Sequence, residues 1–395
     1  MSRRSALAGV PVASALALTL ALALTGCVPN GIKSVGTIIV SASETSCTVS
    51  PATARSGAVS FSIANTGVDA TELEILGSDK EQVIGEKENI GPGVSAHYVA
   101  ELSPGTYYVG CKPGMTGDVV GTTKLVVSSS AHTVTLNASD TKARAAAVTN
   151  YVSYVKDQVG QLVSGTTTFV TAFQAGNNVA AKALYPITRA HYERIEPLAE
   201  KFPALDAELD LRQADLSPGD TWTGWHLIER DLWPPASGYQ AMTSAERAAA
   251  GAQLNSTTAK LAELLTSASF TVTLTDVSNG ADALMAEVAK SKITGEEEIW
   301  SHTDLWDFQA NVEGAQAAYA NVRDIALSKG AKGAKLVAEI DGDFARIVKA
   351  LARYGSIATG YPDYRDLTTA QVKQLSDQVN ALAEPLSRLT AIIVA

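Results

Sequence analysis

The sequence has little positive charge and few histidines or cysteines. Its 395 residues include 31 Lys and Arg, 41 Asp and Glu, five His and three Cys, for a net charge of −10 at pH 7. An excess of acid repels a phosphate backbone, which excludes nucleic acid as an expected partner. The same excess suits cation binding, and it is also an ordinary way for a protein to stay soluble.

Two hydrolase motifs are absent. The sequence contains no HExxH, in which two histidines hold zinc and a glutamate acts as base, and no GxSxG nucleophile elbow. Their absence argues against the zinc peptidases and serine hydrolases that use them. With 46% hydrophobic and 18% charged residues, the chain is globular and long enough for about two domains.

Long hydrophobic runs are scarce as well. The one run long enough to matter, residues 5–24, follows two arginines and ends in the sequence LTGC at Cys27. This is typical of an export signal with a lipobox, so we expect residues 1–26 to be removed, Cys27 to carry the lipid, and residues 27–32 to form a tether. Loss of two arginines and no acid changes the net charge from −10 to −12. The lipid would be the only membrane anchor, holding an exported protein at the outer face of the cell membrane.

The remaining sequence divides by composition. From about residue 33 to 138, Thr, Val, Ser and Gly alternate with the period of strands, and turn sequences such as NTG and GPG recur. We expect a small all-β sandwich there. Residues 139–145 are expected to form a linker. Residues 146–395, rich in Ala, Leu, Val, Glu and Lys at helical spacing, are expected to form an all-α helical bundle.

A histidine and a glutamate three residues apart mark the sequence TWTGWHLIERDLW. On a helix His226 and Glu229 face the same way, and Trp222, Trp225 and Trp233 fall on the same stripe. We therefore expect an inward-facing ionisable pair among indoles. Burial of both groups is costly without a partner, and a bound cation would offset that cost for both. A hydrogen-bonded structural pair is the alternative.

Two further stretches are rich in acid. HYERIEPLAE places Glu193 and Glu196 three residues apart ahead of the histidine helix, where a solvated surface is the alternative to a ligand role. The stretch over residues 293–315 carries the remaining two tryptophans, a histidine and a run of acids that includes Glu297 and Glu298. Its density of Trp, His and acid matches that of the histidine helix.

Several of these segments resemble the EfeO branch of the imelysin-like proteins. GWHLIE is similar to the family's GxHxxE signature, KITGEE and SHTDLWDFQAN resemble two others, and DLRQAD, with Asp210 and Asp215, resembles a segment ahead of GxHxxE. In the β region, the order of elements and TYYVGCKPGM resemble a cupredoxin domain, the module that precedes the helical domain in longer EfeO proteins. The matches run in the family's order from about residue 107 to 314, most of the mature chain.

This resemblance implies an extracytoplasmic, iron-binding lipoprotein of an EfeUOB-type iron uptake system. It would capture Fe(II) or Fe(III) and work with a membrane iron permease and a secreted haem peroxidase. Carboxylates with one imidazole suit iron better than thiolate sites would. The expected metal ligands are an imidazole and acids from three segments: His226, Glu229, Glu193 with Glu196 in reserve, and one of Glu297, Glu298 and Asp304.

The cupredoxin-like region lacks a complete blue-copper site, because no histidine lies between Cys111 and Met115. The resemblance instead implies a second metal site, for iron or copper, with these candidate ligands: Cys47, Cys111, Glu72, Glu74, Glu86 and Glu88. The family's methionine ahead of the second cysteine is Val109 here. A Cys47–Cys111 disulfide is therefore favoured over a metal pair, since disulfides persist in an oxidising compartment.

Two other functions stay open at this point. Imelysin-like proteins are also grouped with metallopeptidases, but a zinc site built on His226 and Glu229 would still need a third ligand and a general base. Metal-bridged binding of an acidic polysaccharide such as alginate would use the aromatic stripe, yet the net negative charge opposes it. The resemblance predicts a binding protein, not an enzyme.

Overall fold

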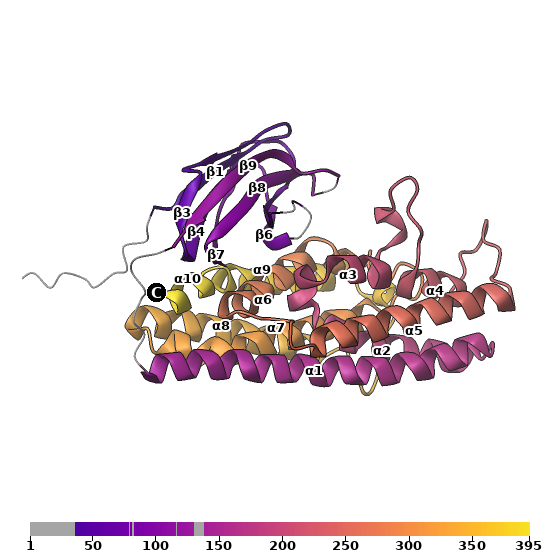
Figure 1. Cartoon of the computed structure of the whole chain (residues 1–395). Helices are drawn as coiled ribbons and strands as arrows, with labels where there is room; N and C mark the ends of the chain where they lie inside the picture. Colours follow the sequence, from indigo (N-terminus) through magenta and orange to yellow (C-terminus); the bar gives the residue numbers. More distant parts are fainter. Residues whose placement is uncertain (1–35, 79, 81–82, 116, 130–137) are drawn as a thin grey trace, which may run out of the picture. The chain divides into compact units, whose positions relative to one another are not determined.

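The computed structural model describes residues 36–395 except 79, 81–82, 116 and 130–137 (Figure 1). The predicted signal sequence, the tether and Cys27 lie outside the described residues. Strands come first along the chain and helices follow, so the predicted order of an all-β region and an all-α region is confirmed. None of the helices in the described part of the chain is both long and apolar enough to cross a bilayer.

The β region is a sandwich of two sheets with the strand orders β2-β1-β4-β7 and β3-β9-β8-β5-β6. Its strands are β1 (Ile38–Ala42), β2 (Cys47–Ser50), β3 (Thr53–Arg55), β4 (Gly57–Asn65), β5 (Thr71–Leu76), β6 (Val83–Ile90), β7 (Ser95–Leu102), β8 (Gly105–Pro113) and β9 (Val120–Ser128). On β4 the alternate residues Val59, Phe61 and Ile63 are buried, as the pleat requires. Residues from both sheets share one apolar core.

A disulfide joins the two sheets. Cys47 begins β2, Cys111 lies in β8, and their Cα atoms are 5.5 Å apart. The bond closes a loop of 64 residues, which by loop entropy stabilises the fold by about 4 kcal/mol. The two sulfurs are bonded to each other and are therefore not free to bind a metal.

The helical region begins earlier than the sequence predicted. The first helix, α1 (Ala138–Gln174), includes residues 139–145, so the predicted linker is wrong for that segment. Asp140 lies in the first turn, where a negative charge favours the helix dipole, and the alanines that follow have the highest helix propensity. These local preferences start the helix before the residues that show the apolar periodicity.

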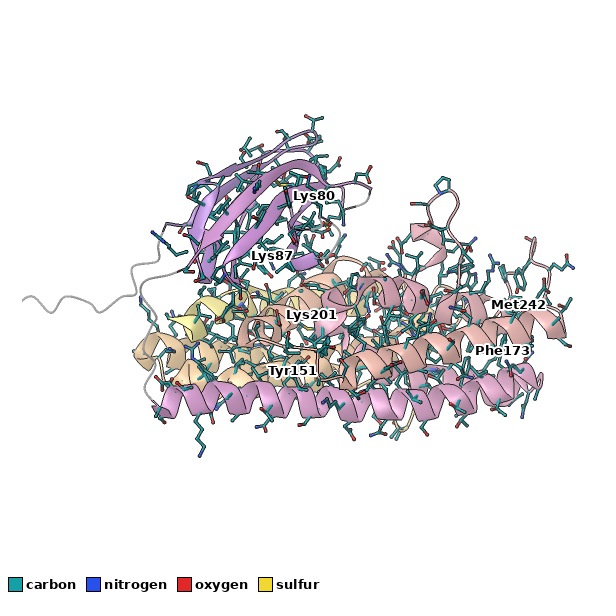
Figure 2. All side chains as sticks on the ribbon, viewed as in Figure 1. Lys80, Lys87, Tyr151, Phe173, Lys201 and Met242 are labelled. Atoms are coloured by element: carbon teal, nitrogen blue, oxygen red, sulfur yellow. A yellow bond between two sulfur atoms is a disulfide. The ribbon has the colours of Figure 1, made fainter. Side chains whose placement is uncertain are left out.

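The other helices share one hydrophobic core with α1. They are α2 (Asn178–Glu193), η1 (Glu196–Lys201), α3 (Pro203–Asp210), η2 (Gln213–Asp215), α4 (Gly224–Leu232), α5 (Ser244–Thr266), α6 (Leu274–Lys290), η3 (Lys292–Thr294), α7 (Asp304–Leu327), α8 (Gly330–Leu351), η4 (Tyr364–Asp366), α9 (Thr369–Leu386) and α10 (Leu389–Val394). The long α1 packs against α2 and α5, and α7 packs against α2, α6 and α8. Tyr151 and Phe173 of α1 are fully buried in the bundle core (Figure 2).

Two glycines bring backbones close together at the centre of the bundle. Gly224 has φ +85°, and a Cβ there would lie 2.0 Å from the carbonyl oxygen of Leu209. At Gly314 a Cβ would lie 2.6 Å from the carbonyl oxygen of Arg194. Only glycine fits such approaches. The first contact sets the start of α4 on the end of α3, and the second sets α7 against the end of α2.

Candidate metal centre

His226 lies in the first turn of α4 and is completely buried. Its Nδ1 is 3.1 Å from Oε2 of Glu229. The other oxygen of Glu229 accepts hydrogen bonds from the backbone N–H groups of Trp300, at 3.0 Å, and Ser301, at 2.7 Å. Because a carboxylate only accepts, Nδ1 must carry the proton. Glu229 thus fixes both the tautomer and the orientation of the ring.

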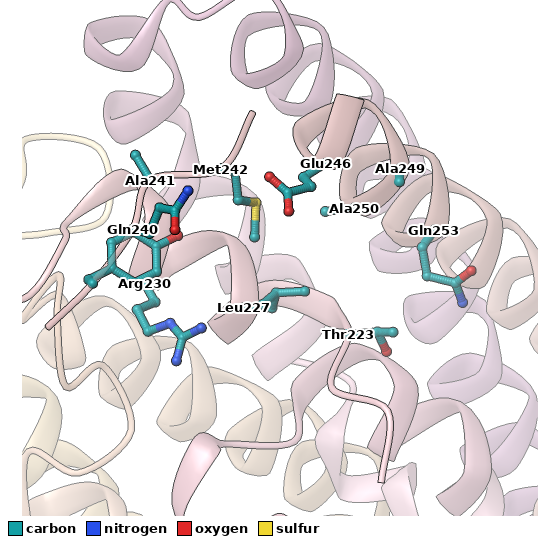
Figure 3. Close-up of a pocket in the computed structure, with 11 residues that line it drawn as sticks. Thr223, Leu227, Arg230, Gln240, Ala241, Met242, Glu246, Ala249, Ala250 and Gln253 are labelled. Carbon is teal, nitrogen blue, oxygen red and sulfur yellow. The ribbon is translucent and has the colours of Figure 1, made fainter. Parts of the chain in front are cut away.

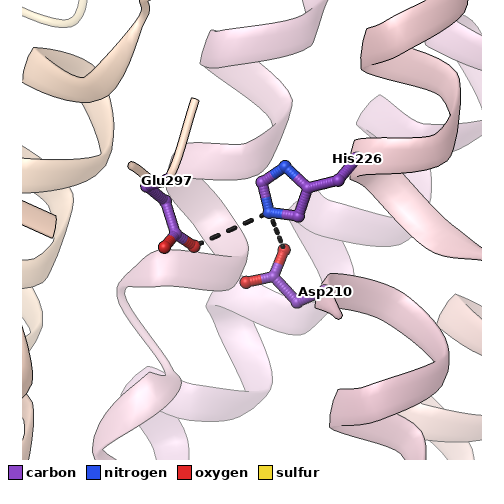
Figure 4. A group of neighbouring side chains, drawn as sticks. All are labelled: Asp210, His226 and Glu297. Atoms are coloured by element: carbon purple, nitrogen blue, oxygen red, sulfur yellow. Dashed lines mark ion pairs between the residues drawn. The ribbon is translucent and has the colours of Figure 1, made fainter. Parts of the chain in front are cut away.

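The second ring nitrogen of His226 faces two acids. Nε2 lies 3.5 Å from Oδ1 of Asp210 and 3.6 Å from Oε1 of Glu297. Figure 4 shows these two ion pairs as dashed lines. It is buried and has no hydrogen-bond partner among the described residues. The donor atoms of these three side chains lie within 4.8 Å of one another. One imidazole nitrogen and two carboxylates, with a carboxylate behind the ring, form a common metal-binding arrangement.

Three short segments bring these donors together. Asp210 is the last residue of α3, directly after the carbonyl that touches Gly224. Glu297 lies in the turn between η3 and α7, which Gly295 opens with a left-handed backbone. The centre is therefore built from the ends of helices, where the direction of the chain changes.

A second group of donors consists of His226, Glu229 and Glu298. Both oxygens of Glu298 already have partners, however. One lies 2.7 Å from Nε of Arg189 and 3.1 Å from the hydroxyl of Tyr185, and the other accepts from the hydroxyl of Ser301 at 2.5 Å. Because Glu298 and Glu229 already have these partners, the Nε2 side of the His226 ring is the side on which a metal ion can bind.

A fully buried arginine lies at the centre of the acidic cluster. Arg189 on α2 forms ion pairs with acids from four segments: Glu193, Asp210, Glu297, Glu298 and Asp307. Burial lowers the pKa of its guanidinium, but these carboxylates outweigh burial and hold the pKa well above its usual value. The arginine is therefore a permanent cation in the cluster.

Lys292 of η3 is the second buried cation. Its Nζ lies 2.8 Å from Oε2 of Glu193 and 2.8 Å from both oxygens of Glu196. Asn311 of α7 donates to the same two carboxylates. Glu193 and Glu196, which the sequence suggested as the third ligand and its reserve, are thus buried and not solvated. They contact Lys292 and do not lie beside the imidazole.

The buried charges do not balance. Seven carboxylates form this acidic cluster: Glu193, Glu196, Asp210, Glu229, Glu297, Glu298 and Asp307. Arg189 and Lys292 compensate two of them, which leaves an excess of five before His226 and the partly exposed Arg212 are counted. Burial raises the pKa of Glu298 and of Asp307 well above the usual range, so protons make up part of the difference.

The histidine responds to the same charges. Burial and Arg189 lower the pKa of His226, but the carboxylates of Glu229, Glu297 and Asp210 outweigh them and raise it to about 10. The ring is therefore protonated at neutral pH when no metal is bound. A metal ion that binds at Nε2 must displace a proton and take over its role as counter-charge.

A cavity of about 240 Å³ opens onto the centre. Its walls include His226, Glu297, Trp300 and Arg212, and Arg212 Nη1 lies 3.6 Å from Oε2 of Glu297. A larger cavity of about 600 Å³ lies elsewhere, between α4 and α5 (Figure 3). The acid in its lining, Glu246, caps the start of α5, so this larger cavity does not offer a metal site.

The prediction that the pair lies among three indoles is wrong. The helix starts only at Gly224, so Trp222 lies ahead of it and packs against Trp300 with the two rings tilted. Trp225 packs against Phe169 in the apolar core, and Trp233 packs against Tyr185. The residues that face His226 and Glu229 are instead charged groups and backbone amides.

The sequence offered partial signals for the residues it missed. Asp210 lies in the DLRQAD segment and Lys292 opens KITGEE, but neither was chosen as part of the site. Arg189 had no signal beyond its helical spacing to Glu193. A buried cation among acids looks in sequence like an ordinary surface ion pair.

In the β region, Glu72 and Glu74 are buried neighbours on β5. Lys112 forms ion pairs with both, and Glu86 completes a group of three carboxylates. Burial raises the pKa of Glu72 to about 7. Because Cys111 is in the disulfide, the region has no thiolate at that position for a blue-copper site.

Known proteins resemble both the helical region and the chain as a whole. The sequence model of the imelysin family (Peptidase_M75) matches residues 147–389. The iron uptake system component EfeO of Escherichia coli (strain K12) is 35% identical over 383 residues, which cover 96% of this chain and 97% of that protein, and EfeO of Shigella flexneri gives the same values. EfeO of Escherichia coli O1:K1 / APEC is 36% identical over 357 residues, 90% of each chain. The chain belongs to the imelysin family and, within it, to the EfeO group of iron uptake system components.

Proposed function

We propose that this protein captures iron outside the cytoplasm at the His226 centre and passes it to a permease in the membrane. Its similarity to EfeO over nearly the whole chain supports a role in iron uptake. The sequence features at residues 1–27 support export and a lipid anchor at Cys27, which would keep the protein beside the permease. A secreted haem peroxidase of the same system is the second expected partner.

The observation that carries the proposal is the buried Nε2 of His226, which has no hydrogen-bond partner among the described residues. It faces Asp210 and Glu297 at 3.5 and 3.6 Å, which is longer than an ordinary hydrogen bond. A metal ion between the three atoms would give Nε2 a partner and would be a second partner for Oδ1 of Asp210, which already pairs with Arg189. We assign Asp210, His226 and Glu297 as the ligands and Glu229 as the residue that orients the ring.

The chemistry of the donors favours iron. Two carboxylates and one imidazole are hard and intermediate ligands, which suit Fe(II) and Fe(III) and offer nothing to metals that require thiolate. The acidic excess of the cluster also favours a highly charged ion, because each added positive charge replaces a bound proton or relieves carboxylate repulsion.

We propose binding in preference to catalysis. A zinc peptidase of the kind that the family's name suggests needs a free carboxylate base beside the metal. Here Asp210 pairs with Arg189, and Glu297 lies near Arg189, Arg212 and Lys292. We expect that neither the iron-loaded nor the zinc-loaded protein cleaves casein. Cleavage that is lost in the His226→Ala variant would instead favour the peptidase.

Iron titration of the mature protein tests the proposal. The parent chain should bind Fe(II) or Fe(III) tightly, and His226→Ala should abolish that binding while far-UV circular dichroism stays unchanged. His191→Ala is the matched control, because His191 is a half-buried histidine of the same region whose Nδ1 contacts Gln158. Loss of binding in the control, or tight binding that survives His226→Ala, would contradict the proposal.

A further inference from the structure

The acidic cluster contains a second cation position next to the His226 centre. The carboxylates of Glu193, Glu196 and Asp210 offer donor atoms within 4.8 Å of one another, which is a spacing that could hold a metal ion. That position already has a cation, because Nζ of Lys292 lies 2.8 Å from Glu193 and from both oxygens of Glu196. The ammonium group makes the contacts that a metal would make, at the longer distances of hydrogen bonds.

Two carboxylates connect the two positions, because Asp210 belongs to both donor groups and Glu297 lies between His226 and Lys292. Oε1 of Glu297 lies 3.6 Å from Nε2 of His226 and 3.7 Å from Nζ of Lys292. A carboxylate between two cation positions is the arrangement found in dinuclear centres of helical bundles, where glutamates and a histidine from several helices surround two metal ions. Here the histidine side is open to a metal and the lysine side is filled by the chain itself.

We propose that Lys292 is a built-in cation that takes the place of a second metal ion, so that the cluster holds one iron where its carboxylates alone would hold two. The inference rests on the proposed function, since it assumes that the first iron binds at His226.

The lysine is suited to this role. Its side chain is buried, with 2% of its surface exposed, so its charge is not screened by water. Burial lowers the pKa of Lys292, but Glu193, Glu196 and Glu297 outweigh burial and hold the pKa well above its usual value. Asn311 donates from Nδ2 to Glu193 and Glu196, and its Oδ1 is buried without a hydrogen-bond partner among the described residues.

A consequence for iron uptake is that the bound ion stays mononuclear. Two adjacent irons that share a carboxylate would react together with oxygen, whereas a carrier must release its cargo. The fixed ammonium group prevents the second ion from binding and competes with the first for Glu297. Removal of the lysine charge should therefore raise both the number of irons and the affinity for the first.

The test is iron stoichiometry of the intact mature protein with Lys292→Met, which keeps an unbranched side chain and removes the charge. We expect one more iron per chain than in the parent, and we expect the EPR signal of isolated high-spin Fe(III) to weaken because the two ions couple. A Glu196→Gln change added to Lys292→Met should restore the parent count. Lys373→Met, at an exposed lysine paired with Asp377, is the control and should change nothing.

Each result separates the two proposals. A parent chain that binds no iron contradicts the proposed function, while a parent that binds iron and a folded Lys292→Met chain that binds the same number overturns the inference alone. If Lys292→Met does not fold, the single variant Glu196→Gln tests the inference instead. That variant should keep the parent's iron, because Glu196 belongs to the lysine, and loss of the iron would overturn the inference.

Discussion

Replacement of Glu229 by glutamine distinguishes a residue that orients the imidazole from one that binds the metal. The two backbone N–H groups of Trp300 and Ser301 require an oxygen and would hold the amide oxygen of the new side chain. Its NH₂ group would then face Nδ1 of His226, where the carboxylate oxygen now lies at 3.1 Å. An NH₂ group donates, so it would favour the neutral ring that accepts at Nδ1 and keeps its proton on Nε2, whereas the carboxylate favours the neutral ring with its proton on Nδ1.

The size of the effect follows from that change of tautomer. Nε2 would carry a proton at the position where the metal binds, so binding would have to reverse the hydrogen bond at Nδ1. Substitutions of such outer residues reduce metal affinity by about 10- to 100-fold, which corresponds to about 1.4 to 2.7 kcal/mol. Loss of a direct ligand such as His226 should instead abolish tight binding.

Competition with a chelator of known affinity measures the difference. Glu229→Gln should retain weakened iron binding, His226→Ala should show none, and Glu246→Gln, which alters a helix cap remote from the centre, should bind as the parent does. The orienting role would be refuted if Glu229→Gln lost iron as completely as His226→Ala. It would also be refuted if Glu229→Gln had no effect, because the ring would then not need Glu229.

The anchor, the histidine proton and the glycine ahead of it each give a further expected outcome. Cys27→Ser should release a folded protein from the membrane fraction, and continued membrane association would show that the lipobox interpretation is wrong. Because the pKa of His226 is raised to about 10, iron affinity should fall as pH falls, by about tenfold per pH unit between about pH 8 and 6 for one displaced proton, and a flat titration would contradict this. Gly224→Ala should lower the melting temperature and weaken iron binding, since its Cβ would lie 2.0 Å from the carbonyl oxygen of Leu209 at a strained φ that costs about 1 to 3 kcal/mol. Gly160→Ala, in a helix with open space around it, should leave both unchanged or raise the melting temperature, and equal losses in the two variants would contradict the argument.

The sequence patterns were sufficient to predict the architecture because their periods show which side chains of a strand or helix are buried. Alternation such as Val59, Phe61 and Ile63 marked the β region, and helical spacing marked the bundle. Where two local preferences competed, the boundary was missed. Residues 139–145 carry no apolar stripe, yet Asp140 and the alanines start the helix before the core does.

The site was predicted in part, for a physical reason. His226 and Glu229 share a helix, so their spacing showed that they face the same way. Asp210 and Glu297 reach the ring only because Gly224 touches Leu209 and because a turn precedes α7, and neither contact has a sequence period. The pH dependence expected from an ordinary imidazole, with loss of binding below about 6.5, is likewise shifted upward by carboxylates that only the fold brings near.

The burial of Lys292 could not be predicted from composition alone. In the sequence it is one lysine ahead of three glutamates, which is typical of a solvated surface. In the fold it is buried on Glu193 and Glu196, so acids that looked like spare ligands already have a counter-charge. The number of carboxylates in a segment therefore overestimates the number of metal ligands.

Iron bound to Nε2 of His226 between Asp210 and Glu297 would be visible in a crystal structure of the iron-loaded mature protein. The anomalous scattering at the iron edge locates the ion. We expect one strong peak within about 2.0 to 2.3 Å of these three atoms, with Glu229 still hydrogen-bonded to Nδ1. Iron bound instead to Glu229 and Glu298, or only to the glutamates of the β region, would contradict this expectation.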